Sequence, residues 1–312
     1  MQMINKDYLY TEIWSRINDV CLPDNSLYIY AHDKEVRSEY CASQLKSKNP
    51  TTKFVEIALL PEDYLIRIED GTMIQLNSSE GLKVFYHQYS PSRIYLEVTG
   101  MSCRLVAPLL KIGLMEHYDI HVVYSEPAHY KIKEFKKVGF HKDLSEDVGD
   151  IYALPGMEKL ITPRKEPLFV TLLGFEGGRL TFLIENQQPS DDNIRPVIGV
   201  PGYRPNYPYV TYLGNRFSLI NHRCWQEVKY AEANSIVDAY MTLGQISRDN
   251  RNPDMIVAPI GTKPHAIGAI LYALKHQDKV ELLYDNPPRT VHRTDGIGKI
   301  LSCNVAKLFN EN

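Results

Sequence analysis

Long hydrophobic runs are missing from this sequence. No apolar stretch approaches the roughly 20 residues that a membrane-spanning helix needs. The first residues, MQMINKDYLYTEIWSRI, also lack the order of charged, apolar and small residues that marks a secretory signal peptide. We therefore expect a cytoplasmic protein with no membrane partner.

The sequence also has little net charge. Its 312 residues include 35 Lys and Arg against 38 Asp and Glu, which gives a formal net charge of −3. A balance this close to neutral argues against an extended nucleic-acid-binding surface. It leaves room for a local basic pocket that binds a small anion.

Cysteines are few and unpaired. There are 5, at positions 21, 41, 103, 224 and 303, and none forms a CxxC motif. An odd number without close pairing argues against both a disulfide framework and a zinc site. We expect these thiols to be buried.

Known catalytic motifs are absent. GxSxG, HExxH and the EF-hand loop do not occur, and the histidines show no metal-ligand spacing. The sequence therefore predicts no metal and no cofactor. Two candidates for acid or base chemistry remain, Glu126 and Asp285, because each ends a predicted strand. Either carboxylate could instead satisfy backbone N–H groups at that place.

What the sequence does contain is a regular alternation of strands and helices. After a helix near residues 6–19, buried strands are predicted at 26–31, 53–60, 92–99 and 119–127, with helical stretches between them. Residues 64–89 look like a hairpin followed by a helix. A polar, turn-rich connection follows, and then strands recur near 167–174, 194–203, 255–260 and 279–287. Residues 204–219 read as irregular.

This alternation predicts an α/β fold with two Rossmann-like halves and mostly parallel sheets, divided as 1–150 and 151–312. The two halves end alike. RIYLEVTG and DMIVAPIGT each place a Thr beside a Gly at the end of a strand, with a basic residue shortly after. The closing strands end in YSEP and YDNP. We interpret this as an internal duplication.

The turn in the second half has the composition of an anion site. Gly261 lets the backbone approach a ligand, Thr262 offers a hydroxyl, and Lys263 adds a positive charge beside a helix N-terminus. His265 adds a donor or covers the start of the helix. The alternative is a simple helix cap, in which Thr262 caps, Pro264 begins the helix and Lys263 is solvated.

Other turns offer similar chemistry. Thr99, Gly100, Ser102 and Arg104 form the matching turn of the first half, and Gly174, Gly177, Gly178 and Arg179 form a third turn. Arg37 could face the same edge of the first sheet. Near the C-terminus, Gly296 and Gly298 suggest a tight loop from which Arg293 could reach a ligand. Tyrosines in the loop 203–212 could stack on a base.

The stretches YLEVTGMSCRLVAPLL and IVAPIGTKPHAIGAIL resemble the CRISPR-associated Rossmann-fold (CARF) sensor domains. The tandem arrangement resembles the fused pair of SAVED domains. The resemblance gives the family's polar and basic positions to Thr99 with Arg104 and to Thr262 with Lys263, and Glu97 takes the acidic or amide position before the threonine. It implies binding of a cyclic or linear oligonucleotide messenger in prokaryotic antiviral defence, with a separate effector protein as partner.

The sequence thus predicts a module that binds a nucleotide or a small phosphorylated molecule where the two sheet ends face each other. Arg104, Arg179 and Lys263 would neutralise phosphate, and binding would shift the angle between the halves. The alternative is a nucleotide-processing transferase or hydrolase on the same scaffold, with Glu126 or Asp285 as acid or base. A scaffold subunit without a small ligand is the third reading.

Overall fold

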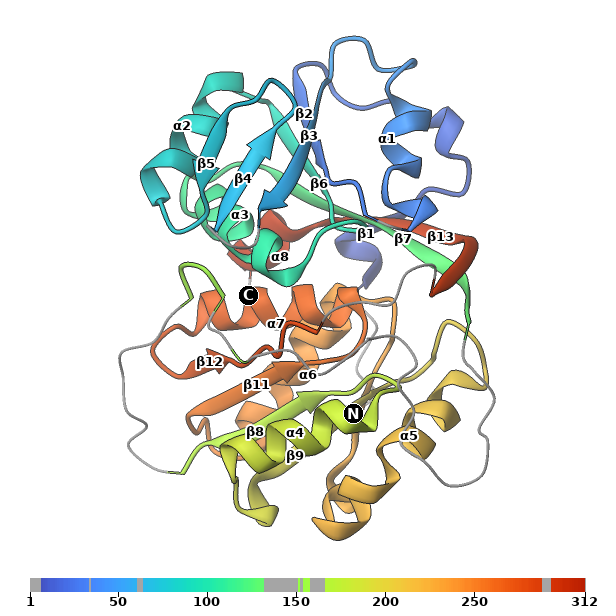
Figure 1. Cartoon of the computed structure of the whole chain (residues 1–312), viewed down its shortest axis with the longest axis vertical. Helices are drawn as coiled ribbons and strands as arrows, with labels where there is room; N and C mark the ends of the chain where they lie inside the picture. Colours follow the sequence, from blue (N-terminus) through green and yellow to red (C-terminus); the bar gives the residue numbers. More distant parts are fainter. Residues whose placement is uncertain are drawn as a thin grey trace. The chain divides into compact units, whose positions relative to one another are not determined.

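The chain folds into two α/β units (Figure 1). The computed structural model describes residues 7–33, 35–60, 64–131, 151, 154–157, 166–287 and 293–311. Unit 1 comprises Met1–Tyr130, Leu154–Gly156 and Thr294–Asn312, and unit 2 comprises Lys131–Ala153 and Met157–Arg293. The predicted fold class, α/β with two mostly parallel sheets, is confirmed. The expected boundary assigned all of 151–312 to the second half, whereas the C-terminal stretch belongs to unit 1.

Unit 1 is built on a mixed sheet. Among the described residues it has eight strands in the order β1-β13-β7-β6-β2-β3-β4-β5. Its four central strands are parallel and rich in buried apolar residues: β2 (Ser26–Tyr30), β3 (Lys53–Leu60), β6 (Arg93–Glu97) and β7 (Ile120–Tyr130). The flanking strands are antiparallel: β1 (Thr11–Ile13), β4 (Leu65–Ile68), β5 (Met73–Gln75) and β13 (Thr294–Asn304).

Three helices of unit 1 lie between strands, as expected, and the helix at its C-terminal end was not predicted. These helices are α1 (Tyr40–Leu45), α2 (Ser79–Tyr89), α3 (Cys103–Met115) and the C-terminal α8 (Val305–Glu311). The hairpin and helix predicted for residues 64–89 are confirmed as β4, β5 and α2. Helix α2 begins where the Ser78 hydroxyl accepts a hydrogen bond from the Gly81 N–H, which is the usual N-cap arrangement.

Two predictions for the ends of the chain were wrong, and they share one cause. The described part of the stretch 6–19 is not an α-helix but two short 3-10 turns around β1, because Thr11–Ile13 pairs with β13. The expected C-terminal loop is β13 itself. Its register shifts between Ile297 and Ile300, and Gly296 has a φ of +64°. Glycines inside a strand commonly mark such a bulge rather than a loop.

Unit 2 is an all-parallel sheet. Its five described strands run in the order β10-β9-β8-β11-β12: β8 (Leu168–Leu172), β9 (Ile194–Gly199), β10 (Lys229–Ala231), β11 (Met255–Pro259) and β12 (Val280–Leu282). The chain leaves β8 toward β9 on one side and returns to β11 on the other. Such a reversal of strand order is where ligands bind in open α/β sheets.

Four helices connect these strands: α4 (Gly177–Gln187), α5 (Tyr207–Asn221), α6 (Ile236–Asp249) and α7 (Lys263–Lys275). Helix α4 packs beside α5, and α6 beside α7. The prediction of an irregular 204–219 segment was wrong, because most of it forms α5. Pro208 lies in the first turn of that helix, where its missing N–H has no consequence.

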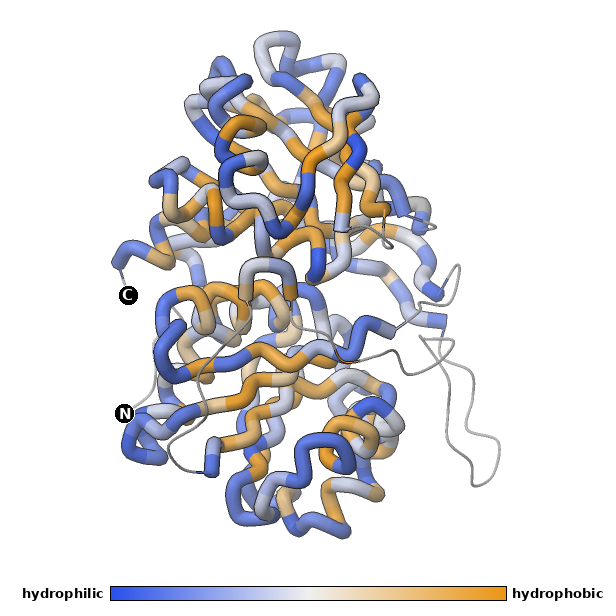
Figure 2. Tube along the Cα trace, turned by 60° about the vertical axis from the view of Figure 1, so that its left-hand side comes forward, coloured by the Kyte–Doolittle hydropathy of each residue, from blue (hydrophilic) through white to orange (hydrophobic). Residues whose placement is uncertain are grey.

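Each unit has its own apolar interior. Figure 2 shows apolar stretches that recur along the trace of the chain. In unit 2, Phe169, Leu183 and Ile198 are among the residues of one buried cluster. In unit 1, Trp14, Tyr28 and Tyr95 belong to another. Within the described ranges, none of the helices has the length and apolar character required to cross a membrane.

Gly100 provides a test of this architecture. A Cβ built on Gly100 would lie 1.9 Å from the backbone oxygen of Ala31, so neither backbone can yield easily. We expect Gly100→Ala to lower the free energy of unfolding by about 2 kcal/mol or more, measured by urea denaturation. Gly178→Ala is the matched control, because a Cβ there meets nothing within 4 Å. Equal stability of the two variants would contradict the described packing.

Candidate functional site

In unit 1, the turn between β6 and α3 lies at a reversal of strand order. Strand β3 follows β2 in the chain and lies on one side of it, whereas β6 lies on the other side. Gly100 of this turn touches the end of β2 through the Ala31 backbone oxygen. The predicted turn Thr99–Arg104 is therefore placed at the switch point of the unit 1 sheet, where ligand-binding loops gather.

Thr99 of this turn serves the fold. Its hydroxyl oxygen accepts a hydrogen bond from the Ser125 N–H of β7 at 3.0 Å, and the residue is buried. The side chain thus ties the turn to the neighbouring strand. This contact accounts for the Thr at the strand end without a ligand.

The N-terminus of α3 is different, because its cap residue makes no capping bond. Ser102 occupies the N-cap position with extended backbone, yet its hydroxyl accepts no hydrogen bond from the first turn. The buried Ser102 Oγ atom also has no partner in the described part of the chain. A helix that begins in this way presents N–H groups and the positive end of its dipole without a side-chain acceptor.

A cation and an aromatic ring lie beside this helix start. Arg104 is in the first turn of α3, and its guanidinium lies 4.5 Å from the centre of the Tyr64 ring. Stacking on an aromatic ring holds a guanidinium in place. The α3 turn, defined as Gly100–Arg104, thus combines the features of an anion site.

Glu97, the last residue of β6, is fully buried beneath this turn. Tyr28 donates a hydrogen bond to its carboxyl at 3.0 Å. Burial raises the pKa of Glu97 to about 8, although the Tyr28 hydroxyl and the Ala42 backbone N–H favour the ionised form. The side chain therefore carries a proton at neutral pH and faces the interior.

Arg37 is buried next to the same edge but is bound within the fold. It donates to the Thr294 hydroxyl at 3.2 Å and to the Ser125 carbonyl at 2.5 Å. The Thr294 hydroxyl in turn donates to Glu35. These contacts tie the segment after β2 to β7 and β13, and they account for a buried arginine at this edge without a ligand.

Glu126 was expected to end its strand, but it lies inside strand β7. Strand β7 continues to Tyr130 because β13 pairs with it as far as Thr294. The Glu126 side chain is buried against Gly298 of β13, whose absent Cβ would lie 3.2 Å from a carboxyl oxygen. A carboxyl group inside a strand ladder is poorly placed for acid–base catalysis on a bound ligand.

In unit 2, the two turns at the switch point press against each other. A Cβ on Gly174 would lie 2.8 Å from the Ile260 oxygen, and a Cβ on Gly261 would lie 2.6 Å from the Leu173 oxygen. The sequence correctly placed both glycines at strand ends. Their contact shows that they are needed for backbone packing between the two turns.

The charged groups beneath these turns neutralise each other. Arg179 donates to both carboxyl oxygens of Asp285, at 2.7 and 2.5 Å, and to the Ile260 carbonyl at 2.9 Å. Glu176 lies 3.5 Å from the same guanidinium. Burial alone would lower the pKa of Arg179, but the hydrogen bonds and charge of Asp285 raise it above its ordinary value. Asp285 is fully buried, and the Arg179 donors are directed into the fold.

The turn before α7 follows the helix-cap alternative. The Thr262 hydroxyl donates to the Ala233 carbonyl at 2.7 Å and accepts from the His265 N–H at 3.4 Å. His265 is fully buried and its Nε2 lies 3.0 Å from the Glu232 carbonyl oxygen, so it belongs to the core. Lys263, the first residue of α7, is half-buried.

The remaining predicted contacts are dispersed. Arg293 precedes β13, and its carbonyl accepts from the Lys131 N–H. The tyrosines of residues 203–212, which were expected to stack on a base, do not form one surface. Tyr207 is buried against Phe175, Tyr209 is exposed, and the Tyr212 hydroxyl lies 2.7 Å from that of Tyr230.

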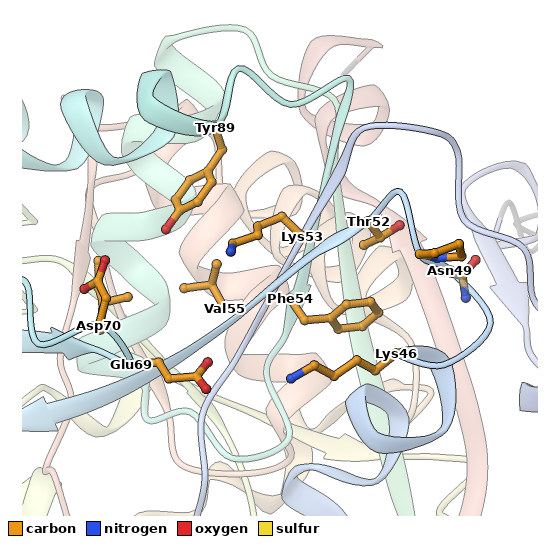
Figure 3. A pocket seen from close by; sticks show the side chains of 11 residues that line it. Lys46, Asn49, Thr52, Lys53, Phe54, Val55, Glu69, Asp70 and Tyr89 are labelled. Atoms are coloured by element: carbon orange, nitrogen blue, oxygen red, sulfur yellow. The ribbon is translucent and has the colours of Figure 1, made fainter.

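A hollow that the sequence did not indicate lies in unit 1, at the amino end of β3 (Figure 3). It encloses about 560 Å³. Figure 3 shows the amino groups of Lys46 and Lys53 and the carboxylates of Glu69 and Asp70 around it. The residues that line the hollow come from three stretches of the sequence, 46–55, 68–70 and Tyr89, so no single local motif indicates it. Its balanced charge favours no anion.

No family model and no curated protein matches this chain. Among solved structures, a GDP-L-fucose synthetase from Naegleria fowleri is similar over 96% of this chain and 91% of its own, with 8% sequence identity and a TM-score of 0.23. Likeness at this level assigns neither a ligand nor an activity.

The buried Glu97 generates a prediction for the pH dependence of stability. Because its pKa is raised in the folded protein, its contribution to stability is complete below the ordinary carboxyl pKa and is lost as the pH rises through about 8. Between about pH 5 and pH 9 we expect the wild type to lose stability relative to Glu97→Gln, by on the order of a few kcal/mol.

Thermal unfolding of both proteins across this range provides the measurement. Glu116→Gln is the control, because Lys83 holds the pKa of Glu116 below its ordinary value and the carboxylate stays ionised throughout. Parallel pH profiles for the wild type and Glu97→Gln would show that Glu97 is not protonated in the folded state.

Proposed function

We propose that this protein binds a nucleotide or another phosphorylated small molecule at the α3 turn of unit 1. The observation that supports this most directly is the uncapped start of α3, where Ser102 makes no capping bond and Arg104 lies over Tyr64. Phosphate oxygens would accept from the N–H groups of the first turn and from the guanidinium. The Tyr64 ring offers a stacking surface for a base.

The corresponding features of unit 2 support an anion site less well. Helix α7 is already capped by Thr262, and the Arg179 donors are engaged by Asp285 and Ile260. Two carboxylates, Glu176 and Asp285, accompany that one guanidinium. The turn of Gly261 and Lys263, at the start of α7, is a second candidate site of the same kind.

A more specific ligand follows from the resemblance to CARF and SAVED sensor domains. Under this proposal the ligand is a cyclic or linear oligonucleotide messenger, and the chain is the sensor of a prokaryotic antiviral system with a separate effector. The α3 turn contains Arg104 and directly follows Thr99, and these two residues are one of the two pairs on which the resemblance is based. The enzymatic alternative gains no support, since Glu126 is buried against β13 and the Asp285 carboxylate is bound by Arg179.

Substitution of Arg104 tests the proposed site. We expect nucleotides or short oligoribonucleotides to raise the melting temperature of the wild type. We expect Arg104→Gln to weaken their binding about 10-fold or more, because one charge-assisted contact to phosphate is lost. Calorimetric titration of the best ligand from a thermal-shift panel measures this. Arg216→Gln is the control, because Arg216 is an exposed residue of α5.

Two further results would redirect the assignment. Loss of binding in Lys263→Gln, with Arg104→Gln unaffected, would move the site to unit 2. Chromatography of the nucleotide after incubation with the isolated chain separates a sensor, which leaves it intact, from an enzyme, which consumes it. A flat response across the panel would argue against nucleotide binding altogether.

A further inference from the structure

The hollow at the amino end of β3 is a notch in the unit 1 sheet. Strand β2 pairs with β3 along residues 53–56, whereas β4 pairs with β3 only along residues 57–60. Within the described residues, no strand therefore pairs with the β4 side of residues 53–55, and these three residues line the hollow. We call residues 53–55 and the hollow beside them the β3 notch.

The backbone of Phe54 offers one donor and one acceptor to the β3 notch. The Glu69 N–H donates to the Glu56 carbonyl at 3.2 Å, so Glu56 directs its backbone polar groups to the β4 side. This direction alternates along a strand, and Phe54, two positions earlier, therefore directs its N–H and carbonyl to the same side. The backbone of another extended peptide matches such a pair of groups.

A buried side-chain atom at this place also lacks a partner. Thr52 lines the hollow and is 8% exposed, and its hydroxyl oxygen has no hydrogen-bond partner among the described residues. Buried hydroxyl groups in folded proteins nearly always have one. The Thr52 hydroxyl is thus a second observation, independent of the strand edge, that favours a polar ligand in the hollow.

The charged side chains around the β3 notch match an added strand. Figure 3 shows Lys53 on one side of β3 and Lys46 on the other. The side chains of an added strand alternate between the same two sides, so two consecutive acidic residues would meet one lysine each. Glu69 and Asp70 lie where β4 ends, and their carboxylates suit an ammonium group. Among the described residues, these four charged groups form no ion pair with one another.

We propose that the β3 notch binds the free amino-terminal end of an acidic peptide, which adds a short strand antiparallel to β3. This direction places the ammonium group of the peptide beside Glu69 and Asp70. The second peptide residue then lies opposite Phe54, exchanges both backbone hydrogen bonds with it, and directs its side chain toward Lys46. The third residue lies opposite Lys53 and directs its side chain to the same side.

The dimensions of the β3 notch agree with a ligand of this length. Three strand residues span about 10 Å. The hollow of about 560 Å³ lies within the range of roughly 300–1,000 Å³ that is typical of sites for small ligands. The β3 notch includes no residue of the α3 turn, so this proposal is independent of the proposed nucleotide site.

Fluorescence anisotropy tests the proposal with the peptide Ala-Glu-Glu-Gly-Lys, labelled on its lysine side chain. We expect saturable binding to the full chain. Acetylation of the peptide's amino terminus should weaken binding about 10-fold, because a charge-assisted contact is lost. N-methylation of the first Glu should have a similar effect, since it removes the N–H that faces Phe54. N-methylation of the second Glu, whose N–H faces away, is the matched control.

Three outcomes would overturn the proposal. The first is no saturable binding at millimolar peptide. The second is an equal effect of the two N-methyl groups, which would exclude strand addition. The third is competition by free glutamate as strong as that of the unlabelled peptide, which would indicate an amino-acid site instead.

Charge reversal tests the register of the peptide. Lys46→Glu should weaken binding about 10-fold, and a peptide with Lys at its second position should restore binding. Lys53→Glu should instead be rescued by Lys at the third position. Both side chains are exposed, so we expect unchanged melting temperatures. Lys299→Glu, at an exposed position of β13, is the control for net charge. Rescue at the opposite positions, or no rescue at all, would exclude the antiparallel arrangement.

The two proposed sites are distinguished by one more variant. Arg104→Gln should bind the acidic peptide as the wild type does, whatever its effect on nucleotides. Loss of peptide binding in Arg104→Gln would show that the peptide binds at the α3 turn and would overturn its assignment to the β3 notch.

Discussion

Backbone contact between strand-following turns is the constraint on which both units depend. In unit 1, Gly100 rests against the carbonyl of Ala31, and in unit 2 Gly174 and Gly261 rest against each other's neighbouring carbonyls. These contacts occur at the places where strand order reverses. They allow a helix to begin close to the end of its strand, because no side chain separates the two turns. The direction of each helix start, and the groups it presents, follow from that approach.

Charged groups around these turns mostly stabilise the fold. Arg179 and Asp285 form a buried pair with two short contacts, and Arg37 joins three segments of unit 1 through Thr294 and Ser125. A buried ion pair gains little net stability, but the loss of one partner is costly because the other charge stays buried. Glu97 avoids that cost by retaining its proton. The α3 turn differs from these sites, because it contains Arg104 and because Ser102 makes no capping hydrogen bond.

The sequence revealed the central strands because each is a short run of buried β-branched and aromatic residues between turn signals. It also placed Gly100, Gly174 and Gly261 correctly, since glycine at a strand end is a local signal. Pairing of distant segments was not readable: β1 and β13 are strands because they pair with each other across nearly the whole chain. Helix α5 was missed because four of its apolar residues face outward and because Pro208, the prolines just before the helix and its tyrosines are typical of a loop. The sequence identified Arg179 and Asp285 as candidate site residues, but it could not show that their side chains bind each other.

The route of the chain through unit 1 has a consequence for how the protein is made. Strand β13 lies between β1 and β7, yet it is synthesised last, after all the strands of unit 2. Until it emerges from the ribosome, β7 has an unpaired edge of backbone N–H and carbonyl groups. Such an edge can recruit other strands, so nascent or truncated chains are vulnerable to aggregation. A fragment that ends near residue 150 lacks β13 and would retain this open edge of β7. A chain in which a short linker joins Tyr130 directly to Thr294 would contain β13 and close the edge.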